Sequence, residues 1–184
     1  MAKAFVLTGP TAVGKGTVIA EIVRSRPDIW FSVSATTRKP RPGEVDGVNY
    51  FFLSEEKFDE LVRGGQMLEW ALVHGLAKYG TPREPVEQAL SQGHTVLLEV
   101  DLAGARQIRE SLPHAQQIFL APPSWADLER RLHGRGTETE GEQKRRLETA
   151  KVEMAAESEF DHVVVNVTVA QATADLLKII DQTQ

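Results

Sequence analysis

The chain has 184 residues and no cysteine, which excludes a disulfide-stapled fold and a zinc site built from thiolates. Its formal net charge of −5 argues against a general nucleic-acid binder, because such proteins carry a basic balance. A chain of this length is expected to form one domain, residues 1–184, that buries a sizeable apolar core.

The first apolar run, AFVLT at residues 4–8, is too short for a signal peptide or a membrane span. We therefore expect a cytoplasmic protein that does not contact a membrane. Three further runs of this kind, and a shorter one at residues 31–33, have the composition of strands. The three long runs lie at residues 95–100, 117–121 and 162–167.

Helices are expected between these runs, at residues 16–26, 102–111, 124–133, 142–157 and 169–181. The apolar runs are continuous rather than alternating, which is typical of strands covered on both faces. Alternation of such strands with helices predicts an α/β fold of three layers, a central parallel sheet flanked by helices.

Two segments interrupt this alternation. Residues 34–93 are rich in proline, glycine, aromatic and charged side chains, and are expected to form an inserted subdomain. The stretch GRGTETEG, residues 134–141, lacks apolar side chains and is expected to form a mobile loop, the main part of a lid at residues 134–146. The core then comprises residues 1–33, 94–133 and 147–184.

The first strand leads into GPTAVGKGT, residues 9–17, which has the spacing of a phosphate loop. Backbone N–H groups and the positive end of the following helix can hold an anion there, and Lys15 can reach the outer phosphates. The alternative is a glycine-rich turn with an exposed lysine. The residues expected to bind a nucleoside triphosphate are Gly9, Pro10, Thr11, Ala12, Val13, Gly14, Lys15, Gly16 and Thr17.

Gly16 occupies the place where this pattern usually has a magnesium-binding hydroxyl, and Thr17 follows one residue later. The loop is in this respect similar to the GKGT loops of adenylate kinases. Thr17 could contact Mg²⁺ or only a phosphate. We expect the ion to be held mainly by phosphates and water.

The inserted segment carries two arginines, Arg38 and Arg41, on either side of Pro40. Two guanidinium groups at this spacing can converge on one phosphate, and the hydroxyl of Tyr50 can add a third donor. The same pattern could also be a solvated turn.

The segments TTRKPRPGE, DGVNYFF and MLEWA, at residues 36–44, 46–52 and 67–71, together with EVD at 99–101, resemble the guanylate kinase family. The resemblance extends over nearly the whole chain, in order and spacing. It implies a GMP-binding insertion, a mobile lid, and ATP-dependent phosphorylation of GMP and dGMP to GDP with Mg²⁺ in purine nucleotide metabolism.

In that setting the carboxylate of Glu69 matches the parallel N1–H and N2–H₂ donors of guanine, and adenine would leave it unpaired. Glu69 could instead be an exposed glutamate on an edge strand. The resemblance implies that Ser34 and Thr81 complete the base pocket and that Tyr79 reaches the GMP phosphate. It also implies that Asn166 contacts the adenine of ATP.

Asp101 ends the strand TVLLEVD, where a Walker-B-type carboxylate belongs, and Glu99 shares its face by strand alternation. Both are expected in the GMP site. Asp101 could orient magnesium-bound water or ligands near the acceptor, and Glu99 could do no more than tether lysine or arginine side chains. Transfer between two anions calls for positioning and for cations from several sides. The expected catalytic residues are Lys15, Arg38, Arg135 and Arg146.

Adjacent helical residues point about 100° apart, so only one of Arg145 and Arg146 should face the site. Arg135 should close over the phosphates with the lid. Two alternatives remain: an interaction module of guanylate-kinase type without catalysis, and a kinase for another nucleoside monophosphate. The expected partners are the small molecules ATP and GMP or dGMP, with no nucleic acid and no obligate protein partner.

Overall fold

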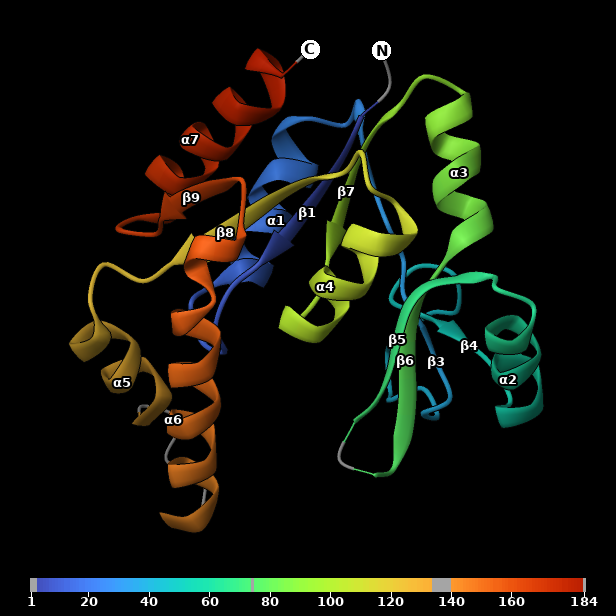
Figure 1. Cartoon of the computed structure of the whole chain (residues 1–184), viewed down its shortest axis with the longest axis horizontal. Coiled ribbons are helices and arrows are strands. Elements are labelled where there is room, and N and C mark those ends of the chain that lie inside the picture. The colour runs from blue at the N-terminus through green and yellow to red at the C-terminus, as the bar shows by residue number, and fades with distance from the viewer. Residues whose placement is uncertain (1–2, 74, 134–139, 184) are drawn as a thin grey trace.

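A computed structural model describes residues 3–73, 75–133 and 140–183. Its centre is a parallel sheet of five strands in the order β2-β7-β1-β8-β9 (Figure 1). The strands are β1 (Ala4–Thr8), β2 (Ile29–Phe31), β7 (Thr95–Glu99), β8 (Gln116–Ala121) and β9 (His162–Val165). The helices of this part are α1 (Lys15–Ser25), α3 (Arg83–Ser91), α4 (Leu102–Ser111), α5 (Trp125–His133), α6 (Glu140–Ala155) and α7 (Val169–Gln182).

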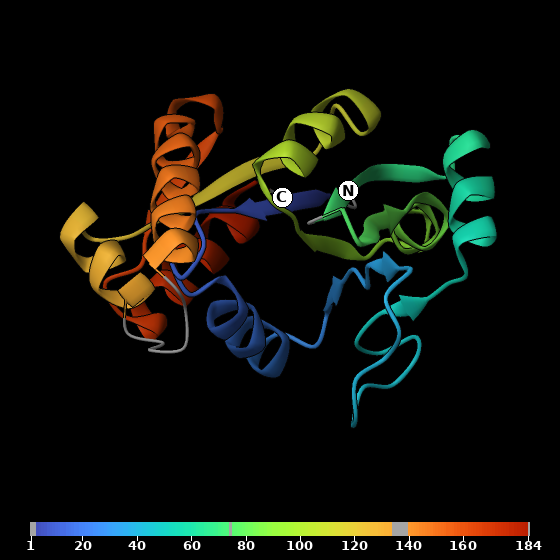
Figure 2. The ribbon, with the colours of Figure 1, turned by 90° about the horizontal axis from the view of Figure 1, so that it is seen from below.

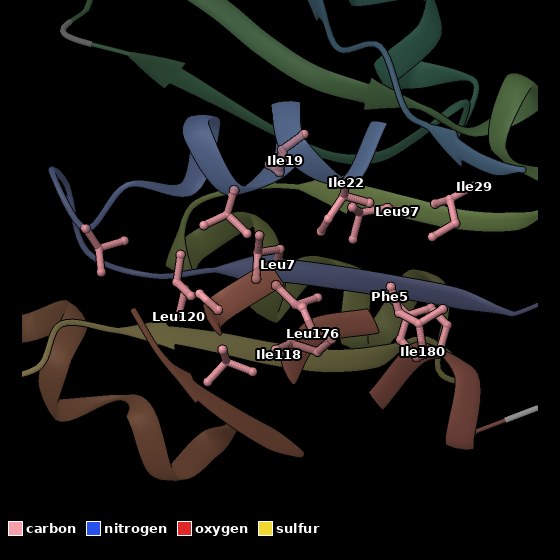
Figure 3. Packing of buried hydrophobic residues seen from close by; sticks show 14 of the residues in the cluster. Phe5, Leu7, Ile19, Ile22, Ile29, Leu97, Ile118, Leu120, Leu176 and Ile180 are labelled. Atoms are coloured by element: carbon pink, nitrogen blue, oxygen red, sulfur yellow. The ribbon is translucent and has the colours of Figure 1, made fainter. Parts of the chain in front are cut away.

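Side chains of β1 alternate between two cores, as expected for a strand with period two. Phe5 and Leu7 pack with residues of α1 and α7, among them Ile22 and Leu176 (Figure 3). Ala4 and Val6 enter the opposite core with residues of α3 and α4. Figure 2 shows α1 and α4 on opposite sides of β1. The predicted α/β architecture with a sheet buried on both faces is confirmed.

The inserted segment forms its own sheet in the order β4-β3-β6-β5. Its elements are β3 (Ala35–Thr36), β4 (Phe51–Phe52), α2 (Glu55–Arg63), β5 (Met67–Val73) and β6 (Ala77–Pro82). Phe58 of α2 is fully buried against Ala35 and Met67 in a small separate core. In Figures 1 and 2 this part lies at one end of the molecule, while α5 and α6 lie at the other.

Several predicted boundaries differ from the structure. The short strand expected at residues 31–33 is Ile29–Phe31, and the helix after the lid begins at Glu140, inside the stretch expected to be a loop. Asp101 does not end a strand: β7 ends at Glu99, and the Asp101 carboxylate caps α4 by accepting from Gly104 N at 2.7 Å. A side chain that satisfies a free helix N–H group is favoured at this position.

Among the described residues, no helix combines the length and the apolar character that crossing a bilayer would demand. A 3₁₀ turn, Glu157–Glu159, joins α6 to β9.

The carboxyl ends of β1 and β7 lead to a cavity that residues of the central sheet and of the insertion line together. Many of the predicted site residues lie around this cavity.

Candidate active site

The phosphate loop connects β1 to α1. Gly14 is the N-cap of α1 with φ of 101°, a left-handed conformation that favours glycine. Ala12 has φ of 68°, which is unusual for a residue with a side chain. Gly14 has no side chain with which to cap α1, so the first N–H groups of this helix are suited to bind an anion. Lys15 Nζ donates to the carbonyl of Gly9 at 2.6 Å.

Two side chains from distant parts of the sequence brace this loop. The carbonyl of Val13 accepts hydrogen bonds from Asn166 Nδ2 at 2.8 Å and from an Arg131 terminal nitrogen at 3.0 Å. Asn166 is buried at the end of β9. Its amide nitrogen holds the loop in place, so a contact of Asn166 with ATP remains a prediction. Arg131 was not predicted as a site residue, because no pattern in the sequence separates it from Arg130.

Two neighbouring cavities meet at the loop. The first has a volume of about 310 Å³ and the second about 540 Å³. Both are lined by Thr11, Lys15 and Glu99. The first also holds predicted acceptor residues, namely Ser34, Tyr50, Glu69, Tyr79 and Asp101. The second adds the loop residues Ala12, Gly14, Gly16 and Thr17, together with Arg131.

Glu69 lines the first cavity, and Thr81 is its partner across β5 and β6. The Thr81 hydroxyl donates to Glu69 Oε1 at 2.7 Å, and both residues are buried. Burial raises the pKa of Glu69 to about 7, and the hydrogen bond from Thr81 opposes this shift. Although β5 is an edge strand of its sheet, Glu69 is buried and lines the cavity, so it is not the exposed glutamate of the alternative interpretation.

The side chain of Arg38 is held by hydrogen bonds and by an aromatic ring. Its Nε donates to the Tyr79 hydroxyl at 3.1 Å, and its terminal nitrogens donate to the two Glu44 oxygens at 2.9 Å each. The guanidinium also lies 5.4 Å from the ring centre of Tyr50. Hydrogen bonding to Arg38 lowers the pKa of Glu44 to about 2.

The side chain of Arg41 is exposed, unlike that of Arg38. In the hydrogen bonds described, Arg41 joins this network through its backbone: its N–H donates to Glu44 Oε2 at 2.7 Å, and its carbonyl accepts from the Glu44 N–H at 3.0 Å. Glu44 was not predicted as a site residue, although an acidic residue that follows three basic ones is a signal for an ion pair.

The charges around Lys15 are partly desolvated. Burial lowers the pKa of Lys15 and raises the pKa of Glu99, while each charge favours ionisation of the other. Glu153 of α6 lines the first cavity and accepts from Thr11 N–H at 3.1 Å, and burial raises its pKa also. No motif marks Glu153 in the sequence, so it was missed.

The lid residues are only partly placed. Arg135 lies outside the described residues. Arg146 on α6 is half-buried and Arg145 is exposed, as expected for neighbours that point in different directions.

A metal ion would have few protein ligands here. Within residues 3–73, 75–133 and 140–183, no group of three or more histidine and acidic side chains could hold one. Thr17 and Glu99 line the same cavity, one hydroxyl and one carboxylate. This donor set fits Mg²⁺, which keeps water and substrate phosphates among its ligands.

The chain is similar to known proteins over most of its length. The family model described as guanylate kinase matches residues 1–183. A guanylate kinase of Leifsonia xyli is 60% identical over 174 residues, which are 95% of this chain and 68% of that protein. One of Cutibacterium acnes is 59% identical over 175 residues, covering 95% and 88%. The crystal structure of guanylate kinase from Anaplasma phagocytophilum has a TM-score of 0.78 and 31% identity, covering 100% of this chain and 86% of that one.

Proposed function

The chain belongs to the guanylate kinase family and transfers a phosphoryl group from ATP to GMP; we propose that GMP occupies the cavity lined by Glu69 and that ATP occupies the phosphate loop. The two cavities share Lys15, so the reacting phosphates meet beside this residue. We further propose that dGMP is accepted and that Mg²⁺ accompanies ATP.

The observation that carries this assignment is a buried carboxylate in the same cavity as the phosphate-loop lysine. Ionised Glu69 offers two acceptors to the N1–H and N2–H₂ donors of guanine. Adenine has an acceptor at N1 and no 2-amino group, so it would leave the buried charge unpaired. Such a mismatch supports discrimination of about 10⁴-fold or more.

For this reaction the protein has to position the two substrates and neutralise the charge of their phosphates. The attacking atom is a phosphate oxygen of GMP that is already ionised near neutral pH, so no residue has to remove a proton from it. Arg38, oriented by Tyr79, would hold the acceptor phosphate, and Lys15 would leave the loop carbonyls to neutralise charge on the transferred group. Mg²⁺, when bound beside Thr17 and Glu99, would add further charge neutralisation.

Transfer would proceed in line, from the ATP γ-phosphate to the GMP oxygen, with the loop amides holding the donor. Arg146, and Arg135 from the lid, would supply cations on the donor side. The small molecules ATP and GMP are the only partners this account requires.

A coupled assay with ATP and one acceptor at a time tests the proposal. GMP and dGMP should be turned over, while AMP, UMP and dTMP should have kcat/KM values lower by about 10⁴-fold. Comparable turnover of AMP would overturn the assignment of Glu69 to the base. Turnover of UMP or dTMP in place of GMP would overturn the assignment of the cavity.

A further inference from the structure

Gly104 occupies a position where the backbone does not require glycine. It lies in the first turn of α4 and is buried, and its φ is outside the left-handed range. Glycine inside a helix is disfavoured relative to alanine. The reason for a glycine here must therefore lie in the space around it.

That space is taken by groups of the active site. A Cβ at position 104 would lie 3.0 Å from Glu69 Oε2, 3.0 Å from Val100 Cβ and 3.3 Å from Asp101 Oδ1. Val100 is attached to rigid backbone, and Asp101 is held by its bond to Gly104 N–H at 2.7 Å. The contact with Val100 is to its Cβ, so only a small backbone shift relieves it, whereas Glu69 Oε2 ends a long side chain and is the active-site atom that a Cβ would displace.

The two oxygens of Glu69 have different neighbours. Oε1 is held by the Thr81 hydroxyl, and Oε2 lies against the first turn of α4 at Gly104. A methyl group at position 104 would displace Oε2 while Oε1 stays bonded to Thr81. The carboxylate would then rotate away from its present orientation. A carboxylate can pair with two parallel donors only when both oxygens point along the donor directions.

We propose that Gly104 is a positioning residue that determines base specificity, because its missing side chain lets the Glu69 carboxylate lie flat against α4 and face the N1–H and 2-amino donors of guanine. This inference rests on the proposed role of Glu69 as the base-reading residue. Gly104 touches no substrate in this account and acts through Glu69.

The test compares Gly104→Ala with the unchanged enzyme, using GMP, IMP and ATP. IMP has the N1–H donor but lacks the 2-amino group. The KM for GMP should rise by about tenfold or more, as expected for the loss of one hydrogen bond to a charged group, while kcat and the KM for ATP stay unchanged. The preference in kcat/KM for GMP over IMP should fall by a similar factor.

Ala103→Gly is the matched control, because it makes the reverse change of residue type at an exposed position of the same helix turn. It should leave the KM for GMP and the preference over IMP unchanged. A loss of helix stability alone would give similar kinetic changes in both variants, or raise the KM for ATP and GMP together, and either result would contradict the inference.

A double-mutant cycle separates this inference from the proposed function. Glu69→Ala alone should raise the KM for GMP, and Gly104→Ala should add no further increase in that background, because the obstructing carboxylate is gone. If Glu69→Ala leaves the KM for GMP unchanged, the proposed function fails. If Glu69→Ala raises the KM but Gly104→Ala does not, or if the two effects add, only the role of Gly104 fails. The contact with Val100 Cβ is present in both backgrounds, so should Gly104→Ala lower stability, Glu69→Ala should recover the part of that loss due to the carboxylate, and no recovery would contradict the inference.

Discussion

Arg38 and Glu44 form a bidentate ion pair, in which each terminal nitrogen of the guanidinium donates to one carboxylate oxygen at 2.9 Å. The same carboxylate accepts the backbone N–H of Arg41. One acid therefore orients the side chain of the first arginine and fixes the backbone at the second. With the proposed role of Arg38, this arrangement would hold the acceptor-phosphate site in one geometry before GMP binds.

Glu44→Gln should weaken GMP binding. Glutamine keeps one acceptor oxygen but loses the charge and the second acceptor, so Arg38 would no longer be held in a single orientation. We expect the KM for GMP to rise by about tenfold, with a smaller change in kcat and none in the KM for ATP. Glu56→Gln, an exposed position on α2, serves as the control. A lower KM for GMP would mean that Glu44 competes with the phosphate and does not support the site.

Lys15→Ala should lower kcat strongly and leave the fold intact. Lys15 lies where the two cavities meet, and its Nζ donates to the carbonyls of Gly9 and Pro10. Because it is not part of the apolar core, its replacement should not leave a cavity there. A fall in kcat of about 10²–10³-fold is expected from the loss of one charge aimed at the transferred group. Circular dichroism should be unchanged. Near-normal turnover would refute the role of the loop.

The burial of Glu69 predicts a pH dependence. The pKa of this carboxyl is raised from its ordinary 4.5 to about 7, and guanine requires the ionised form. The kcat/KM for GMP should therefore fall as the pH drops below about 7, by up to tenfold per pH unit. In Glu69→Gln this inflection should be absent, whereas the ionisation of GMP itself affects both enzymes equally.

The same group affects stability with a definite sign. Because its folded-state pKa is raised, the stability linked to its protonation is present below about 4.5 and is lost as the pH rises through about 7. Holding the charge in the pocket costs at most roughly 3 kcal/mol. Glu69→Gln should thus gain stability over the unchanged enzyme at pH 8 and lose that advantage toward pH 5, measured by urea unfolding. A constant difference would show that the carboxyl does not titrate in this range.

Lys78 links α2 to the sheet of the insertion. Its Nζ lies 2.5 Å from Asp59 and 2.9 Å from Glu55, and its own side chain is 20% exposed. Lys78→Ala should lower the melting temperature by roughly 2–4 °C, an effect that shrinks in high salt because these charges are partly screened. Lys57→Ala, which removes a more exposed pair with Glu60, should have a smaller effect. Equal decreases in melting temperature for the two variants would show that the ion pairs of Lys78 stabilise the fold no more than an exposed pair does.

Much of the core could be predicted because its signals are local. The apolar run of β1 and the helix Leu102–Ser111 were predicted with the bounds that the structure has, and the phosphate loop lies between a strand and a helix as its pattern indicates. The family and its reaction followed from the motifs, and the comparisons confirm both.

Other features depend on tertiary contacts and could not be read from the sequence. β3 and β4 are two residues long and exist only through pairing, so they leave no periodic signal. Arg131 and Glu153 reach the loop across 118 and 142 residues of sequence. Asp101 was expected at the end of a strand, but it caps α4, because the chain turns into the helix directly after Val100.

The central claim is that one buried carboxylate selects the acceptor base, and Glu69→Ala tests it most directly. Steady-state kinetics should show a KM for GMP raised by about 10²-fold or more, with the KM for ATP unchanged and the chain folded. Equal losses for both nucleotides, or an unchanged KM for GMP, would contradict the account.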